Sequence, residues 1–202
     1  MEKHISITNN DEKIEAGIHY QHKTRAAIIM HPHSLMGGNM DNPIVQVVQQ
    51  TFSEKGFTTV RFNFRGVGYS TGNFDDGIGE QDDLIAVMNF LIANGRHEFD
   101  LVGYSFGSWV LAHAVQKKLD YLKIMMISPP VAFMDFSEIK QVPGLTNIVT
   151  GSHDEFAPPH MVEKYLKDWK SDAKLHIINT ADHFYSAHVD EIKKKFTQLA
   201  EL

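Results

Sequence analysis

The sequence contains no cysteine, so disulfide bonds, thiol nucleophiles and cysteine-ligated metals are excluded. Basic residues are not in excess, because 19 Lys and Arg stand against 25 Asp and Glu. The net charge of -6 gives no reason to expect a nucleic-acid partner, which favours a basic face. No apolar run approaches membrane-spanning length, and the polar start MEKHISITNNDEK does not resemble a signal peptide. We therefore expect a cytoplasmic protein with no nucleic-acid or membrane partner, and the oligomeric state stays open.

What is present is an ordinary globular composition, with 43% hydrophobic and 22% charged residues. A chain of 202 residues predicts a single domain over residues 1–202 that can bury a sizeable core. Histidine is frequent, with 12 residues, but no zinc-type H-x-x-x-H spacing occurs. The pair His31 and His33 is weak support for a metal, so we predict neither a metal nor a cofactor.

Hydrophobic patterning predicts an α/β fold. Two alternating segments, 4–8 and 14–20, indicate an antiparallel hairpin. Continuous apolar runs then alternate with helical patterns, which is typical of a parallel sheet between two layers of helices. The predicted strands are 25–31, 58–64, 99–104, 121–128, 147–151 and 174–179, and the predicted helices are 43–56, 80–95, 106–119, 159–170 and 187–202. The expected architecture is three-layered, with a mostly parallel sheet of about eight strands.

The pentad GYSFG places Ser105 between Gly103 and Gly107, where a predicted strand meets a predicted helix. A serine hydroxyl becomes a good nucleophile only when a base takes its proton, and a third group must orient that base. In a strand–turn–helix nucleophile, the acid and then the histidine follow in the chain. The carboxyl ends of parallel strands share one edge of a sheet, so these partners should lie in later loops at that edge.

The acid is predicted to be Asp154, three residues past the strand end at Gly151. Glu155 is its nearest competitor, and a turn or capping acid ahead of Pro158 is the structural alternative. Asp172 lies at the wrong end of a strand.

The base is predicted to be His183, in the loop beyond the last predicted strand. His176 lies within that strand, His188 falls in the following helix, and His153 is too close to the acid in the chain.

An acyl-transfer site also needs donors for the developing oxyanion. We expect the backbone amide of Phe106, at the start of the helix, to be one of them. The second should come from the loop after strand 25–31. Because Pro32 has no N–H, His33 is the expected donor.

Five motifs in this order resemble the α/β-hydrolase superfamily: HPHSLMGG, RFNFRGVGYSTG, GYSFG, GSHDEFAPP and ADHFYS. The resemblance runs from about Arg25 to the C-terminus and is to the small lidless branch, often described as dienelactone-hydrolase-like or serine-peptidase-like esterases. It implies a nucleophile at Ser105, an acid at Asp154 and a base at His183. The chain departs from many relatives at Pro32, where they have glycine. Dienelactone hydrolases proper use cysteine, so their specific activity does not carry over.

Other signals have structural explanations. GVGYSTG resembles a dinucleotide fingerprint, but Thr71 replaces its third glycine and no helix follows at once. Gly37 and Gly38 are expected to let a loop bend rather than to cradle phosphate. The acids Glu80, Asp82 and Asp83 fit the first turn of a helix better than a metal site, and one of them is expected to pair with Arg65.

The segment between Ser128 and Asn147 is too short for a helical cap, so we expect an open, shallow site. Its lining is expected to draw on the apolar residues near the triad loops, for any one of which core packing is an equal alternative: Phe133, Phe136, Phe156, Phe184 and Tyr185.

The sequence therefore predicts a serine hydrolase that cleaves carboxylic esters or thioesters of small molecules through an acyl-enzyme. An amidase or peptidase with the same triad is the alternative of the same class. A non-catalytic binding protein that keeps the fold is the alternative of another class, because a fold alone does not establish activity.

Overall fold

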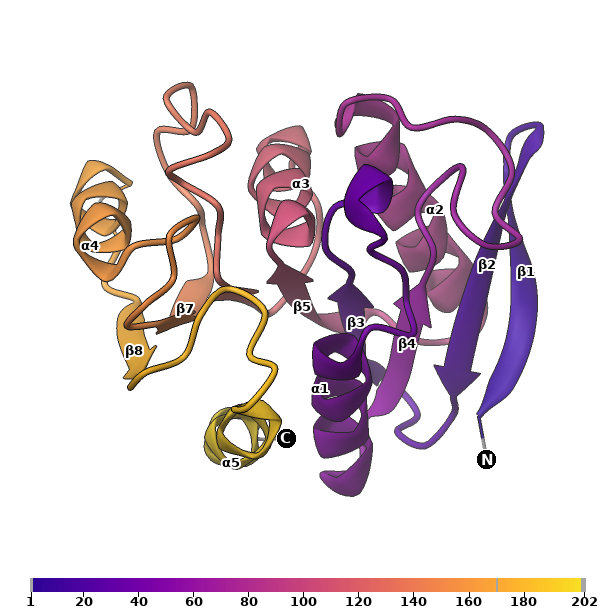
Figure 1. Cartoon of the computed structure of the whole chain (residues 1–202). Helices are drawn as coiled ribbons and strands as arrows, with labels where there is room; N and C mark the ends of the chain where they lie inside the picture. The colour runs from indigo at the N-terminus through magenta and orange to yellow at the C-terminus, as the bar shows by residue number, and fades with distance from the viewer. Residues whose placement is uncertain (1, 170, 201–202) are drawn as a thin grey trace.

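A single eight-stranded sheet organises the computed structural model, which describes residues 2–169 and 171–200 (Figure 1). Its strand order is β1-β2-β4-β3-β5-β6-β7-β8. The strands are β1 (Lys3–Asn9), β2 (Glu12–His19), β3 (Arg25–Met30), β4 (Thr58–Phe62), β5 (Glu98–Tyr104), β6 (Lys123–Ile127), β7 (Leu145–Gly151) and β8 (Lys174–Ile178). β1 pairs antiparallel with β2, β2 pairs antiparallel with β4, and all other pairs are parallel. The predicted hairpin and mostly parallel sheet are confirmed.

Helices cover both faces of this sheet, which confirms the three-layer prediction (Figure 1). α1 and α5 lie on one face, and α2, α3 and α4 lie on the other. The helices are α1 (Pro43–Glu54), α2 (Ile78–Ala93), α3 (Phe106–Ala114), α4 (Pro159–Asp168) and α5 (Val189–Leu199), with short 3-10 turns η1 (Ser34–Met36) and η2 (Val115–Lys117).

The apolar run of β3 shows why such strands are central. Ala26, Ile28 and Met30 belong to the hydrophobic cluster under α2 and α3. Ala27 and Ile29 belong to the cluster under α1 and α5. Side chains alternate across a strand, so a strand buried on both faces must be apolar at every position.

Several helix ends differ from the predicted ones for local reasons. α2 begins at Ile78 rather than at residue 80, because the Glu80 carboxylate accepts a hydrogen bond from the Gly77 amide and caps an earlier turn. α3 ends at Ala114 rather than at residue 119, because the chain tightens into η2 and Lys118 then adopts a left-handed conformation. α4 ends at Asp168 and α5 covers Val189–Leu199, while residues 170 and 201–202 of the predicted helices lie outside the described residues.

The connection from β6 to β7, residues 128–144, contains turns and no helix among its residues, all of which are described. Its apolar side chains Phe136, Ile139 and Val142 are buried in the core cluster under α3 and α4. The fold has no cap domain over the carboxyl edge of the sheet, as the length of this segment predicted. Over the described residues, no helix combines the length and hydropathy that a bilayer crossing would need.

Candidate active site

Ser105 occupies a sharp turn between β5 and α3. Its backbone has φ 54° and ψ -117°, a region that L-residues rarely adopt. Such a conformation costs roughly 1–3 kcal/mol and persists only when its surroundings enforce it. Here the Ser105 amide donates a hydrogen bond to the Ile127 carbonyl of β6 at 2.8 Å. The turn lifts the Ser105 side chain out of the strand and onto the carboxyl edge of the sheet.

The two glycines of the pentad are required by close packing. A Cβ on Gly103 would lie 2.5 Å from the Gly107 carbonyl oxygen, inside the turn from β5 to α3. A Cβ on Gly107 would lie 2.8 Å from both the Cβ and the carbonyl oxygen of Met30 in β3. The glycines therefore let α3 start directly against two neighbouring strands, and this contact holds the turn at Ser105.

His183 and Asp154 meet Ser105 at this edge, as the sequence predicted for their positions. His183 follows β8, and its Nε2 lies 2.8 Å from the Ser105 Oγ. Asp154 follows β7, and its two carboxylate oxygens lie 2.9 and 3.1 Å from the His183 Nδ1. All three residues are buried, with exposed fractions of 7% for Ser105, 2% for Asp154 and 7% for His183. The competing Glu155 is exposed, and the competing His176 instead contacts the Asn147 side chain.

The Asp154 carboxylate is held ionised. Burial by itself raises its pKa, but the hydrogen bond and charge of His183, together with hydrogen bonds from Ser128 and the Ala157 amide, hold the pKa of Asp154 below its ordinary value. The amides of Phe156 and Ala157 donate to its Oδ1 at 3.0 and 2.8 Å. An ionised carboxylate accepts a hydrogen bond from Nδ1–H, so it favours the tautomer of the neutral ring whose Nε2 lone pair faces the serine hydroxyl.

Tyr104 and Tyr185 support the loop that carries His183, and sequence reasoning missed both roles. The Tyr104 hydroxyl donates to the His183 carbonyl oxygen at 2.8 Å. The Tyr185 hydroxyl lies 2.6 Å from the Ser128 Oγ, and both groups are buried. Burial raises the pKa of each tyrosine, so both remain neutral hydrogen-bonding groups. The signal available in the sequence was the position of these tyrosines, one directly before Ser105 and one two residues after His183.

His31 orients the peptide bond between Pro32 and His33. The Phe64 amide donates to the His31 Nε2 at 3.0 Å, so the proton of this ring lies on Nδ1. Nδ1 in turn donates to the Pro32 carbonyl oxygen at 2.6 Å. In a trans peptide the N–H points opposite to the carbonyl, so the His33 amide points away from His31. Burial lowers the pKa of His31 to about 4, which keeps the ring neutral at pH 7.

The two amides predicted as oxyanion donors both lie at the cavity that contains Ser105. Phe106 is the first residue of α3, so its amide has no acceptor within the helix. Among the described residues, neither the Phe106 nor the His33 amide donates a hydrogen bond. Both residues line the same cavity as Ser105. The His33 ring packs on the Phe106 ring at 4.8 Å and on the Phe74 ring at 5.1 Å.

The cavity at Ser105 has an empty volume of about 620 Å³, part of which is open to solvent. Its walls come from the loops after β3, β5, β6, β7 and β8: Pro32, His33, Met36, Gly37, Gly38, Asn42, Tyr104, Ser105, Phe106, Pro130, Phe133, Met134, Phe156, His183 and Phe184. Three of the five apolar residues predicted as lining, Phe133, Phe156 and Phe184, are among them.

For Phe136 and Tyr185 the alternative of core packing holds, because neither residue lines the cavity. Phe136 is fully buried and packs on Trp169, with ring centroids 5.7 Å apart. Tyr185 is fully buried and points to Ser128 beneath the site. An apolar residue in a loop near an active site can line the cavity or pack in the core. Only the direction of its side chain distinguishes these two positions.

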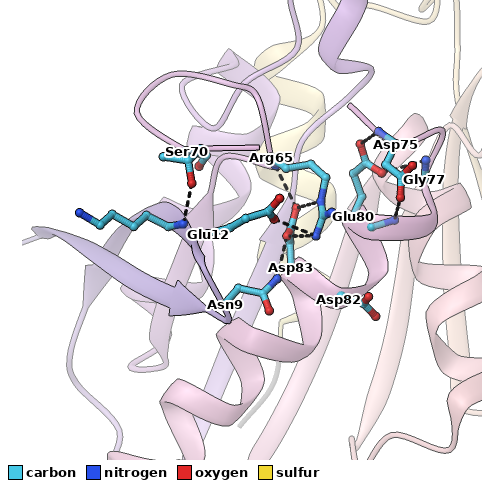
Figure 2. A network of polar contacts seen from close by, with 12 residues as sticks. Asn9, Glu12, Arg65, Ser70, Asp75, Gly77, Glu80, Asp82 and Asp83 are labelled. Atoms are coloured by element: carbon cyan, nitrogen blue, oxygen red, sulfur yellow. Dashed lines mark hydrogen bonds and ion pairs between the residues drawn. The ribbon is translucent and has the colours of Figure 1, made fainter. Parts of the chain in front are cut away.

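The acids at the start of α2 form structural contacts, as expected. Figure 2 shows Asp83 facing Arg65, whose Nη2 lies 2.8 Å from the Asp83 Oδ1. Asn9 donates to the same oxygen at 3.1 Å, and Glu12 lies 3.3 Å from Arg65. Glu80 accepts from backbone amides at the helix start. No three His, Asp or Glu side chains within the described parts of the chain are placed to share a metal ion.

The loop that carries GVGYSTG has no helix directly after it, because α2 begins only at Ile78. Gly66, Gly68 and Gly72 all have positive φ, as tight turns require. Near the cavity, Gly37 has φ 82°, and a Cβ on Gly38 would overlap the Pro32 carbonyl. These glycines shape loops, as the sequence indicated.

Comparison with known proteins identifies the family and the fold. A family model described as the alpha/beta hydrolase fold matches residues 28–147. An uncharacterised protein of Rickettsia prowazekii is 34% identical over 178 residues, which cover 83% of this chain and 75% of that protein. The structure of an alpha-beta serine hydrolase homologue from Coxiella burnetii superposes with a TM-score of 0.88 at 30% identity, covering 98% of this chain and 96% of the other. A serine hydrolase without a lid from Xanthomonas campestris superposes with a TM-score of 0.89 at 29% identity, covering 98% and 92%.

Proposed function

The chain belongs to the alpha/beta hydrolase fold family, and from that premise we propose that it is a serine hydrolase of small-molecule carboxylic esters or thioesters, with Ser105, His183 and Asp154 as its catalytic triad. The observation that carries the proposal is the contact of 2.8 Å between the Ser105 Oγ and the His183 Nε2, with Asp154 on the opposite ring nitrogen. We propose one domain over residues 1–202 and no cofactor. A cytoplasmic location stays a prediction from the sequence.

Acylation starts when the Ser105 Oγ attacks the carbonyl carbon and its proton passes to the His183 Nε2. Asp154 stabilises the imidazolium that forms. The carbonyl oxygen becomes an oxyanion, and the amides of Phe106 and His33 donate to it. These two donors are already oriented before substrate binds, so they need no reorganisation as charge develops.

The tetrahedral intermediate collapses when the His183 Nε2 returns the proton to the leaving oxygen or sulfur. The bond from the carbonyl carbon to the leaving atom breaks, and the acyl group stays on the Ser105 Oγ. Water then gives a proton to His183 and attacks the acyl-enzyme. The same proton returns to the Ser105 Oγ as the carboxylic acid leaves.

Amides are the second substrate class for this triad. Residues 128–144 form no cap, so they supply no wall that would select an extended peptide. We therefore rank peptides below esters as substrates.

The test is hydrolysis of p-nitrophenyl esters, from acetate to long acyl chains, by the wild type and by Ser105→Ala. We expect kcat/KM to fall about 10⁴-fold or more in the variant, because the nucleophile is lost while Ala keeps the backbone of the turn. Ser6→Ala, at an exposed serine of β1, is the matched control and should keep full activity. Reaction with a fluorophosphonate probe, mapped by peptide mass spectrometry, should label Ser105.

Full esterase activity in Ser105→Ala would contradict the triad. A wild-type protein that neither hydrolyses any ester nor reacts with the probe would instead favour a binding protein that keeps the hydrolase fold.

A further inference from the structure

Three phenylalanines lie together beside the His183 ring, and we name them the phenylalanine cluster: Phe133, Phe156 and Phe184. Phe156 packs on His183, with ring centroids 4.6 Å apart, and Phe184 stands perpendicular to His183 at 5.5 Å. Phe133 meets Phe156 edge to face at 5.5 Å. The cluster is assembled from the loops after β6, β7 and β8, so three separate segments supply one aromatic surface.

Folding does not explain this surface. Phe133 is 59% exposed and Phe184 is 60% exposed, so neither ring fills the core. Both line the cavity that contains Ser105. Apolar rings that gather at the mouth of a cavity are typical of ligand contacts rather than of chance exposure.

The chemistry of the triad indicates which part of a substrate reaches this surface. The tetrahedral carbon carries the Ser105 Oγ, the oxyanion, the acyl chain and the leaving atom. The oxyanion lies toward the amides of Phe106 and His33. The leaving atom must come within hydrogen-bond reach of the His183 Nε2 to receive its proton. The group attached to the leaving atom therefore extends along the side of His183 where the cluster lies.

The cavity also restricts the charge of that group. Among the described residues that line it, none is Asp, Glu, Lys or Arg. A charged leaving group would lose hydration there without gaining a partner. Aromatic rings pack favourably against the edges and faces of other rings, and an apolar group loses nothing by leaving water.

We propose that the phenylalanine cluster binds the leaving alcohol or thiol of the substrate and makes the enzyme select esters whose leaving group is bulky, uncharged and apolar, above all aromatic. This inference rests on the proposed function and names the substrate class of the same site. The cluster residues are specificity determinants, because they contact the departing group and take no part in proton transfer.

The test compares 2-phenylethyl acetate with ethyl acetate. The acyl group is the same and the two alcohols are similarly basic, so the ratio of kcat/KM values reports binding of the phenyl group. We expect a ratio of about 10 or more in the wild type, from burial of the ring against the cluster in the transition state. Phe184→Ala should lower the ratio to about 3, and Phe133→Ala combined with Phe184→Ala should lower it further.

Both truncations remove exposed rings and keep every backbone amide, so the fold should persist, and circular dichroism checks this. Phe184→Tyr keeps a ring at the position and should keep the ratio near its wild-type value. Tyr69→Ala removes a ring that is 88% exposed and lies outside the cavity, so it is the matched control and should leave the ratio unchanged.

A ratio near 1 in the wild type, or a ratio that survives both truncations, would overturn the leaving-group inference while the proposed esterase stands. Labelling of Ser105 by the fluorophosphonate probe without hydrolysis of either acetate would also count against this inference alone. Failure of labelling and of hydrolysis together would overturn the proposed function, and the inference with it.

Discussion

Two of the buried clusters of polar side chains differ in the hydrogen-bonding groups that they leave without a partner. At the carboxyl edge, Ser105, His183 and Asp154 form a chain of hydrogen bonds that ends at a cavity. Between the hairpin and α2, the partly buried Arg65 forms an ion pair with the fully buried Asp83, which Figure 2 shows with Asn9 and Glu12 around it. Both clusters contain buried charge.

In the cluster between the hairpin and α2, the polar groups pair with one another. Asp83 accepts from the Arg65 amide and guanidinium and from Asn9, and its carboxylate is fully buried. The site at the carboxyl edge instead combines a strained backbone at Ser105, a histidine in contact with the serine hydroxyl, and two amides that find no acceptor among the described residues. Buried charge therefore does not distinguish a reactive site from a structural one. A reactive site is distinguished by hydrogen-bonding groups that have no protein partner and lie beside a cavity.

In the comparison of these two clusters, the largest effect is expected from Asp154→Asn. The amide side chain can present N–H to the His183 Nδ1, which favours the wrong tautomer and leaves Nε2 protonated toward Ser105. We expect kcat to fall about 10⁴-fold, measured with p-nitrophenyl acetate, with only a small change in the urea midpoint. Activity close to wild type would place the acid elsewhere.

The opposite pattern is expected for Asp83→Asn. The Arg65 guanidinium loses its buried counter-ion, so the free energy of unfolding should fall by about 4 kcal/mol. Urea denaturation measures the loss, and kcat/KM of the folded fraction should be unchanged. If Asp83→Asn lowers kcat/KM and leaves the free energy of unfolding unchanged, the cluster around Arg65 and Asp83 is not purely structural.

A third effect concerns His31, beneath the predicted oxyanion amide of His33. Burial lowers the pKa of His31 from 6.5 to about 4, although the Pro32 carbonyl opposes this shift. Between about pH 6.5 and pH 4 the unfolded chain therefore binds a proton that the folded protein does not. The free energy of unfolding should fall as the pH drops through this window, by up to about 3 kcal/mol at pH 4.

Urea unfolding at a series of pH values measures this slope. His31→Asn removes the titrating group, so its unfolding free energy should depend less steeply on pH over the same window. An equal slope in the variant and the wild type would show that His31 does not carry the effect.

The smallest effect is expected at Asp82, next to Asp83 in α2. Its side chain is 55% exposed and pairs with Lys117 on the surface. Asp82→Asn should change the free energy of unfolding by no more than about 0.5 kcal/mol. It is the matched control for Asp83→Asn, because the chemical change is identical and only burial differs. A loss as large as that of Asp83→Asn would remove burial as the explanation.

Much of the fold was predictable because the strands are apolar in a way that surface segments are not. β3 is buried on both faces, so after Arg25 it is a continuous apolar run. The hairpin alternates because its register places Ile14, Ala16 and Ile18 toward one cluster. Helix ends were less predictable. The end of α3 depends on a left-handed residue at Lys118, which no local signal such as glycine announces.

The candidate site was predictable in position because parallel strands bring their carboxyl ends to one edge, whatever the separation in the chain. The catalytic roles of Ser105, Asp154 and His183 remain proposals. Sequence reasoning missed the positioning of the Pro32–His33 peptide by His31, because a histidine in an H-x-H pair looks the same whether it lies in a cavity or under it.

The sequence by itself determined the order of strands and helices, the residue types at each strand end and the absence of thiol chemistry, since these follow from local patterning and composition. Only the tertiary structure decided which aromatic rings face the cavity, which glycines allow α3 to approach β3, and that His183 lies 2.8 Å from Ser105. The physical reason is that the direction of a side chain and the close approach of two elements depend on packing between segments far apart in the chain. Local sequence preferences do not determine that packing.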